Sequence, residues 1–314
     1  MTADQGATYS RRDLGIMALA AFPAGNLLAE PNSRFGGVQI GIIISPVALH
    51  DLPLRADELL HNVVELGINA IELQDVRVES CAGAPTRVPV RGNQEPEQAR
   101  RRAEQQLTQW RLAASMDKYR ELRQMYHRAG VNIYAFRLPI LSSDKSDAEF
   151  DYFFNTARAL GADQITTELP KDPEFTARIG ALAAKHKMMV GYHNHTQVKF
   201  DSWDTALAQS KYNGINFDVG HYAAAVSQSP IPFMEKYHDR ITCLHLKDRK
   251  FGTHGGQNVP WGQGDTPLKE ILVLMQRKKY RFPAGIELEY KIPEGSTSAA
   301  EIQKCLQFCR AALI

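Results

Sequence analysis

The sequence predicts an α/β fold, a single-domain (β/α)8 barrel. From Val38 onward, short apolar runs rich in β-branched residues alternate with longer segments of helical spacing, and there are eight of each. Strands that alternate with helices form parallel sheets through right-handed crossovers. Eight such units in about 280 residues suit a closed barrel. An open doubly wound sheet is the alternative, but no GxGxxG follows the first strand, so a nucleotide-binding version has no support.

Strands are expected where apolar residues run on without polar alternation, as in strands that are buried on both faces. The first is QIGIII at residues 39–44, and the second is AIELQ at residues 70–74. Six more runs follow, at residues 132–138, 164–168, 188–193, 215–218, 241–246 and 284–290.

Helices are expected where apolar residues recur every three or four positions. Gly67, Gly130 and Gly161 each stand where such a pattern stops, which is typical of a helix C-terminus. The eight expected helices cover residues 54–66, 100–128, 147–160, 172–185, 203–210, 232–238, 267–278 and 297–312. The polar stretch at residues 75–97 contains Pro and Gly and is expected to be a loop insertion.

Residues 1–33 are expected to be an export signal and linker, and residues 34–314 the barrel. Arg11 and Arg12 precede a short apolar stretch without charge, and Ala29 stands before a polar segment. This order is typical of a signal peptide, and the arginine pair resembles the bacterial twin-arginine signal. We therefore expect a periplasmic or otherwise exported protein; an ordinary amphipathic helix, the alternative, would leave it cytoplasmic. No other segment has the roughly 20 apolar residues of a membrane span.

Composition and charge narrow the class of function. The chain has 37 Lys+Arg against 35 Asp+Glu, a net charge of +2, and 44% hydrophobic residues. This composition excludes a disordered chain. A protein built to bind nucleic acid would carry clustered basic residues and a high net charge. An enzyme that acts on a small molecule is the class that remains.

Polar residues collect at the expected C-terminal ends of the strands, where a (β/α)8 barrel carries its active site. Such ends carry Glu72, Arg137, Glu168, His193 with Asn194 and His195, Asp218 with His221, His245 with Lys247, and Glu287 with Glu289. Buried charges without partners cost several kcal/mol each, so this cluster needs a counter-ion. Carboxylates with imidazoles and no thiolate suit Mn²⁺, Mg²⁺, Co²⁺ or Zn²⁺. The sequence therefore predicts a divalent metal site.

Three of these strand ends resemble motifs of a known family. Residues 217–221 (FDVGH) resemble a D-x-G-H strand, residues 245–248 (HLKD) an H-x-K-D strand, and residues 191–195 (GYHNH) a GYHNH strand. Strands of this kind are found in the sugar phosphate isomerase/epimerase family of the xylose isomerase-like TIM barrel superfamily, the last one in a bacterial branch. The resemblance covers the chain from about Val38 to the C-terminus.

The resemblance implies one divalent metal, held by a Glu, an Asp, a His and a second Glu. Asp218 matches the Asp, His245 the His and Glu287 the second Glu. His193 stands where the family has its first Glu, while Glu168 ends the neighbouring strand. We expect Glu168 to replace the missing ligand, and His193 to be a ligand or a substrate contact.

The chemistry that the resemblance implies is proton transfer next to a carbonyl. A divalent ion on a carbonyl and its neighbouring hydroxyl stabilises the enediolate that is left when the α-proton departs. Glu289 or His193 is the expected general base, and Lys247 would stabilise negative charge on oxygen. Glu289 is also the alternative to Glu287 as metal ligand. The residues expected to contact substrate are Arg137, Asn194, His195, His221, Trp261 and Glu72.

The expected activity is that of a divalent-metal-dependent sugar isomerase or epimerase, with Mn²⁺ as the preferred ion. A dehydratase or lyase would use the same site if the intermediate expels an oxygen substituent. An apurinic endonuclease-like hydrolase needs a basic DNA face, and a non-catalytic sugar-binding barrel needs no acidic and imidazole strand ends, so both are less favoured. An exported protein meets free sugars or glycosides rather than sugar phosphates. The sequence leaves open which sugar is used and whether the chain forms a homo-oligomer.

Overall fold

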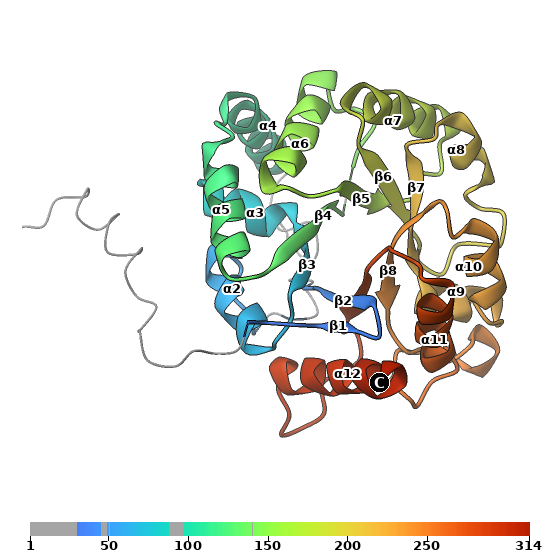
Figure 1. Cartoon of the computed structure of the whole chain (residues 1–314). Helices are drawn as coiled ribbons and strands as arrows, with labels where there is room; N and C mark the ends of the chain where they lie inside the picture. Colours follow the sequence, from blue (N-terminus) through green and yellow to red (C-terminus); the bar gives the residue numbers. More distant parts are fainter. Residues whose placement is uncertain (1–29, 45–48, 50, 88–96, 140) are drawn as a thin grey trace, which may run out of the picture. The chain divides into compact units, whose positions relative to one another are not determined.

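Eight parallel strands close into a barrel (Figure 1). They pair in chain order from β2 to β9, and β9 pairs with β2. The strands are β2 (Val38–Ile43), β3 (Ala70–Gln74), β4 (Asn132–Leu138), β5 (Gln164–Glu168), β6 (Met189–His193), β7 (Asn213–Asp218), β8 (Ile241–Leu246) and β9 (Ala284–Glu287). A short strand, β1 (Arg34–Phe35), pairs antiparallel with β2. The prediction of a closed (β/α)8 barrel is confirmed.

The computed structural model describes residues 30–44, 49, 51–87, 97–139 and 141–314. Residues Pro31–Ile314 form one compact unit. Ser33 belongs to it, since its buried hydroxyl donates a hydrogen bond to the carbonyl of Ile40 (2.6 Å). Residues 1–29, which carry the predicted export signal, lie outside the described residues.

Helices surround the barrel (Figure 1). They are α2 (Ala56–Glu65), α3 (Asp75–Ala82), α4 (Glu97–Ala113), α5 (Asp117–Arg128), α6 (Asp147–Leu160), α7 (Pro173–His186), α8 (Asp204–Gln209), α9 (Val219–Val226), α10 (Ile231–Tyr237), α11 (Leu268–Lys278) and α12 (Ser298–Leu313), with a 3-10 turn at Gly252–His254. Helix α6 has the predicted bounds, because Ser146 and Glu149 form a capping box at its start and Gly161 adopts the left-handed conformation (φ 76°) at its end.

Helix α3 occupies part of the stretch that was expected to be a loop, so that expectation is wrong for residues 75–82. Its Asp75 and Glu79 carboxylates form ion pairs with Arg87 and Arg111. Glu79 and Arg111 are buried together, with Oε1 2.9 Å from Nε. These ion pairs join residues that are distant in sequence, so the local sequence pattern did not predict them.

Two further helices depart from the prediction. The expected helix at residues 100–128 is divided into α4 and α5, because the Ser115 hydroxyl accepts a hydrogen bond from the Asp117 N–H (3.1 Å) and competes with helical pairing. Helix α9 was not predicted. It begins directly after β7, where Asp218 caps it by accepting a hydrogen bond from the His221 N–H (2.7 Å).

The alternation of side chains along the strands decides which groups face the interior of the barrel. Along β8, Leu244 and Leu246 pack in the main hydrophobic core, whereas Cys243 belongs to a separate small cluster inside the barrel. His245 lies two residues after Cys243 and shares its inward face. The register pairs His245 with Asp218 of β7. Polar side chains from neighbouring strands therefore converge at the C-terminal rim.

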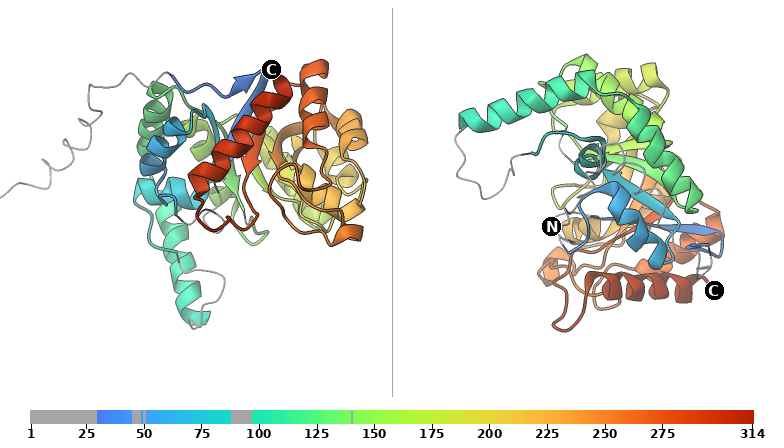
Figure 2. Two further views of the ribbon diagram at one scale, coloured as in Figure 1. Left: turned by 90° about the horizontal axis from the view of Figure 1, so that it is seen from below. Right: turned by 90° about the vertical axis from the view of Figure 1, so that its left-hand side faces the viewer.

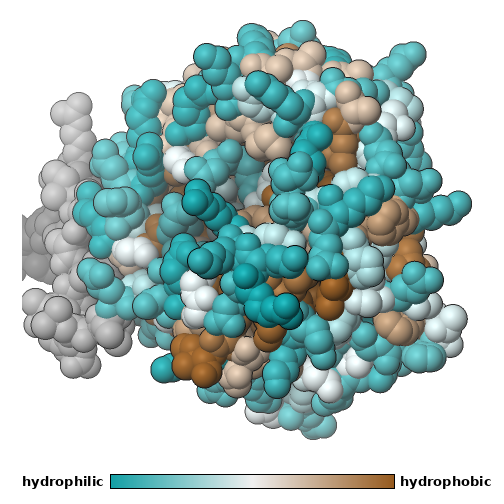
Figure 3. Space-filling model, turned by 45° about the vertical axis from the view of Figure 1, so that its right-hand side comes forward, coloured by the Kyte–Doolittle hydropathy of each residue, from teal (hydrophilic) through white to brown (hydrophobic). Residues whose placement is uncertain are grey.

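One face of the barrel unit is largely polar (Figure 3). Helix α4 extends beyond its neighbours in both views of Figure 2, and of its residues Leu107 and Arg111 are buried. The face shown in Figure 3 is mostly hydrophilic, with hydrophobic side chains in small separate groups. Among the described residues, no helix combines the length and the hydropathy needed to cross a membrane.

Candidate metal centre

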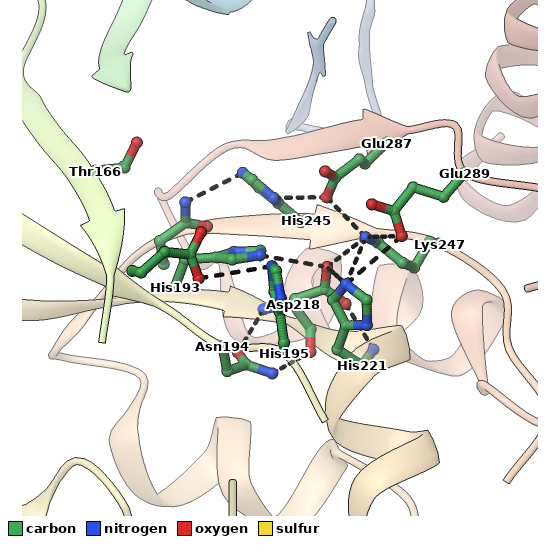
Figure 4. Close-up of polar contacts among 12 residues, drawn as sticks. Thr166, His193, Asn194, His195, Asp218, His221, His245, Lys247, Glu287 and Glu289 are labelled. Carbon is green, nitrogen blue, oxygen red and sulfur yellow. Dashed lines mark hydrogen bonds and ion pairs between the residues drawn. The ribbon is translucent and has the colours of Figure 1, made fainter. Parts of the chain in front are cut away.

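Four side chains meet at the C-terminal rim of β6 to β9 (Figure 4). We call His193, Asp218, His245 and Glu287 the ligand group, since each offers one donor atom and these atoms all lie within 4.8 Å of one another. All four side chains are buried. The structure thus brings together three of the four expected metal ligands, with His193 beside them rather than Glu168.

Asp218 ends β7, and its two carboxylate oxygens have different surroundings. One oxygen accepts a hydrogen bond, and the other faces the remaining three members of the ligand group. Oδ1 caps α9, whereas Oδ2 accepts no hydrogen bond from the described residues, although Lys247 Nζ lies 2.9 Å away. Burial raises the pKa of Asp218 to about 7, against the opposing charge of Lys247. Asn194 fixes this strand end: it donates to the Asp218 carbonyl (3.1 Å) and accepts from its N–H (2.9 Å). Its amide thus contacts the backbone of Asp218, and a contact of Asn194 with substrate stays a prediction.

Both ring nitrogens of His245 face carboxylates. Nδ1 is 2.7 Å from Oε2 of Glu287, and Nε2 is 3.0 Å from Oε2 of Glu72. Burial lowers the pKa of His245, but the two carboxylates outweigh it and raise this pKa to about 9. Burial raises the pKa of Glu287, yet the Lys247 and His245 charges bring it well below its usual value. Without a metal, His245 is therefore a cation between two anions. Glu72 contacts the His245 ring, and its role as a substrate contact stays a prediction.

Lys247 supplies a second internal cation. Its ammonium lies 2.9 Å from Asp218, 3.0 Å from Glu287 and 2.7 Å from Glu289. Burial opposes the charge, but the three carboxylates raise the pKa of Lys247 above its ordinary value. Gly220 makes room for the lysine stem, because a Cβ at residue 220 would lie 2.4 Å from Lys247 Cγ. The charge is thus held between the ligand group and Glu289.

Glu289 stands at the edge of the site. Strand β9 ends at Glu287, earlier than the expected residue 290, so Glu289 lies in the segment that follows. Its side chain is 27% exposed, and Oε2 lies 2.7 Å from Lys247 Nζ and 3.5 Å from His221 Nε2. A carboxylate that borders both the buried charges and solvent is well placed to exchange a proton with a substrate.

Glu168, the expected fourth ligand, has other partners. The register places it beside His193. Its Oε1 pairs with Arg137 (2.5 Å), and its Oε2 lies 3.6 Å from His195 Nε2. Among the described residues, the groups able to hold a metal do not include Glu168. Arg137, Glu168 and His195 form a separate polar cluster next to the ligand group. Arg137 is buried in this cluster, and its NH1 has no hydrogen-bond partner among the described residues.

Arg249 is a site residue that the sequence analysis did not single out; the only signal was its place directly after the H-x-K-D motif. It contacts Nδ1 of His221, while Lys247 Nζ lies 3.1 Å from Nε2, so both ring nitrogens face groups that only donate hydrogen bonds. Nε2 also lies 3.5 Å from Glu289 Oε2 and 3.7 Å from Asp218 Oδ2. Burial holds the pKa of His221 well below its usual value, so the ring stays neutral. A carbonyl of Gly256 fixes Arg249 Nε (2.9 Å).

Asp248 ties down the loop after β8. Its Oδ2 accepts hydrogen bonds from the N–H groups of Gly262 (2.8 Å) and Gly264 (2.9 Å). Residue 264 must be glycine, since a Cβ there would lie 1.9 Å from Asp248 Oδ1. Trp261 of this loop packs edge to face on Phe308, with ring centroids 5.7 Å apart. Stacking of Trp261 on a sugar therefore stays a prediction.

The ligand group fits a divalent metal. Asp218 Oδ2 and His193 Nδ1 are buried and have no hydrogen-bond partner among the described residues. Burial and the charge of Arg137 lower the pKa of His193 well below its usual value, so this imidazole is neutral, as a metal ligand must be. Two imidazoles and two carboxylates suit Mn²⁺, Co²⁺ or Zn²⁺.

A second group of donors, His193, His195 and His221, is equally compact. However, the two ring nitrogens of His221 face Arg249 and Lys247. Their positive charges oppose a cation at this place. The ligand group is therefore the better candidate for a metal.

A closed α/β barrel with buried carboxylates and imidazoles at its C-terminal rim defines a TIM-barrel protein with a candidate metal centre. The family model described as "Xylose isomerase-like TIM barrel" matches residues 60–311, and the chain belongs to this family. No curated protein matches the chain.

Solved structures share the fold. A sugar phosphate isomerase/epimerase from Parabacteroides distasonis has 18% identity and a TM-score of 0.57, over 88% of this chain and 96% of that one. A D-psicose 3-epimerase from Clostridium cellulolyticum has 14% identity and a TM-score of 0.58, over 88% and 99%. A structure titled as a probable 3-DHS dehydratase from Bacillus anthracis has 13% identity and a TM-score of 0.60, over 85% and 98%. At these identities the likeness shows the fold alone.

Proposed function

We propose that the chain is a divalent-metal-dependent sugar isomerase or epimerase that moves a proton next to a carbonyl. The observation that carries the proposal is the buried ligand group, with Glu289 and Lys247 beside it. In this proposal His193, not Glu168, is the fourth ligand, because Glu168 is paired with Arg137. Mn²⁺ is the preferred ion, with Co²⁺, Zn²⁺ or Mg²⁺ as alternatives.

A divalent ion held by the ligand group supplies a Lewis acid, which makes the hydrogen next to a carbonyl more acidic. Glu289 takes this proton and returns it to the same carbon in an epimerase or to the adjacent one in an isomerase. Lys247, 2.7 Å from Glu289, offsets the negative charge that develops on the substrate oxygen. His221, whose Nε2 lies 3.5 Å from Glu289, is placed to form a hydrogen bond with a substrate hydroxyl.

The proposed substrate is a keto-sugar without a phosphate. Phosphate recognition uses cations whose charge is not already balanced, or the N-terminus of a helix. Arg137 is paired with Glu168, and Lys247 contacts three carboxylates. Arg137 and Lys247 are therefore committed to the site itself, and the start of α9 is capped by Asp218, which favours a neutral ligand beside them.

A dehydratase or lyase is the second candidate, and the groups beside Glu289 favour it. An elimination needs a proton donor for the departing oxygen as well as a base. Lys247 Nζ lies 2.7 Å from Glu289 Oε2, and His221 Nε2 lies 3.5 Å from it, so a proton donor and the base are adjacent. The solved structures that share the fold include an epimerase and a probable dehydratase.

Turnover in D₂O tests the proposal. We expect the Mn²⁺-loaded protein to introduce deuterium at a carbon that flanks the carbonyl of a keto-sugar or 3-keto-glycoside, as followed by proton NMR. An elimination product in place of the exchanged sugar would select the dehydratase. Turnover with neither deuterium nor elimination would contradict proton transfer through solvent and indicate a hydride shift or hydrolysis.

For the segment at residues 1–29 we propose export by a twin-arginine signal, which the order of basic pair and apolar run supports. The double substitution Arg11→Lys and Arg12→Lys is expected to keep the protein in the cytoplasm of a bacterial host, because that pathway reads the arginine pair. Cell fractionation measures this. A chain without residues 1–29 serves as the control and should melt at the same temperature as the full chain. Unchanged localisation of the double variant would reject the signal.

A further inference from the structure

The Glu72 carboxylate lies inside the barrel, beneath the ligand group. It is on β3, and its side chain is 0% exposed. Oε1 accepts a hydrogen bond from the hydroxyl of Thr166 on β5 (2.5 Å), and Oε2 lies 3.0 Å from Nε2 of His245 on β8. One buried acid thus links three strands across the interior.

A carboxylate is an unfavourable choice for filling space in a barrel. Removing an ion from water costs several kcal/mol, and only a well-placed partner offsets this cost. Among the described residues, Glu72 makes polar contacts with the Thr166 hydroxyl, the Cys243 thiol (3.9 Å) and His245, and the charge of Arg137 also favours its ionised form. The acid therefore acts on an imidazole that belongs to the ligand group.

The contact selects one form of that imidazole. An ionised carboxylate only accepts hydrogen bonds, so Nε2 of His245 carries a proton. Nδ1, on the side of Glu287, is then the nitrogen whose lone pair is available to a metal. Asn216 Nδ2 lies 3.1 Å from Nε2; with its amide turned by 180°, Asn216 Oδ1 becomes a second acceptor for the same N–H.

We infer that Glu72 is a positioning residue for the metal centre: it holds His245 with Nε2 protonated, directs Nδ1 into the ligand group, and strengthens Nδ1 as a donor. The inference rests on the proposed function, since it assigns a task only if the ligand group binds a metal. Partners of this kind typically change metal affinity 10- to 100-fold.

A different task for the same residues is a second metal between Glu72, Cys243 and His245, whose donor atoms also lie within 4.8 Å of one another. Burial raises the pKa of Cys243 well above its usual value, so the sulfur stays a thiol, and metals bind the thiolate. The number of ions bound per chain distinguishes the two tasks. One ion agrees with the positioning role, and two would overturn it.

The test is titration of the metal-free chain with Mn²⁺ by calorimetry and with Co²⁺ by visible absorption. Glu72→Gln keeps the size and one acceptor oxygen but removes the charge, and we expect about 10-fold weaker binding; Glu72→Ala also removes the acceptor, and we expect about 100-fold. The Co²⁺ spectrum of both variants should shift, because the surroundings of the ion change. Glu79→Gln is the matched control: another buried glutamate, paired with Arg111. Its affinity and spectrum should equal those of the unchanged chain.

The outcomes distinguish a failure of the proposed function from a failure of the positioning role. If the unchanged chain binds no metal, the proposed function fails. If it binds one ion and Glu72→Gln binds with the same affinity and the same Co²⁺ spectrum, the positioning role alone is overturned. Should both Glu72 variants fail to fold, Thr166→Val loosens Glu72 by removing its hydroxyl partner. Weaker metal binding in that variant supports the inference, and unchanged binding overturns it.

Discussion

Asp218→Ala is expected to abolish metal binding and to reduce turnover to the uncatalysed background. Oδ2 of Asp218 is the buried oxygen that faces the ligand group without a hydrogen bond from the described residues. Its removal leaves an incomplete set of ligands and deprives Lys247 of one of its three carboxylates. Metal content is measured by elemental analysis after loading with Mn²⁺, and turnover by proton NMR.

Asp218→Asn separates the ligand role from the helix cap. Asp and Asn cap helices about equally well, whereas Ala costs roughly 0.5–2 kcal/mol. The asparagine variant therefore keeps the start of α9 but presents a neutral oxygen to the metal. We expect both variants to lose metal and only the alanine variant to lose the stability of the cap, read from denaturant midpoints. Metal content equal to that of the unchanged chain would contradict the ligand role.

Glu289→Gln is expected to slow turnover by ~10²–10⁴-fold while the metal stays bound, as is typical of a lost general base. The amide keeps the size of the side chain and can still accept a hydrogen bond from Lys247, which lies 2.7 Å away. The measurements are the turnover rate and the metal content of the same preparation. Deuterium exchange at the carbon next to the carbonyl should slow in parallel.

His193→Ala provides the contrast for this experiment. Because His193 belongs to the ligand group and is buried, its removal should lower metal content as well as turnover. A variant of the general base should therefore lose turnover and keep its metal, whereas a variant of a ligand should lose both. Loss of metal from Glu289→Gln would make Glu289 a ligand, and undiminished turnover would place the base elsewhere.

Strands such as β2 were predictable because they are buried on both faces and therefore read as continuous apolar runs. Helices with local signals were predictable too, such as α6, whose Ser146 cap and Gly161 stop are visible in the sequence. Helices α3 and α9 were not. The first depends on ion pairs with Arg87 and Arg111, and the second on a cap from a residue that also ends a strand.

The candidate site was predictable as a set of strand ends, but the pairing of its groups was not. Asp218, His245 and Glu287 were expected together because parallel strands end at one rim. The partner of Glu168, by contrast, depends on Arg137, 31 residues earlier, whose side chain reaches across from the adjacent strand. Glu72 stands in the middle of β3, and the alternation of side chains along the strand places it on the face that lines the interior of the barrel. Its burial was therefore predictable from the sequence.

The Asp248 carboxylate holds the loop after β8 by accepting hydrogen bonds from main-chain N–H groups of that loop. Because the donors of these hydrogen bonds are main-chain groups, the bonds do not require particular side chains in the loop, except that residue 264 must be glycine. Substitutions at loop positions such as Trp261 and Gln263 can therefore alter the rim of the barrel while the backbone keeps its course. The fold thus separates a loop whose side chains can vary from the strand ends that carry the ligand group. Substrate specificity can therefore diverge, in nature or in a designed library, through changes in this loop that leave the metal centre intact.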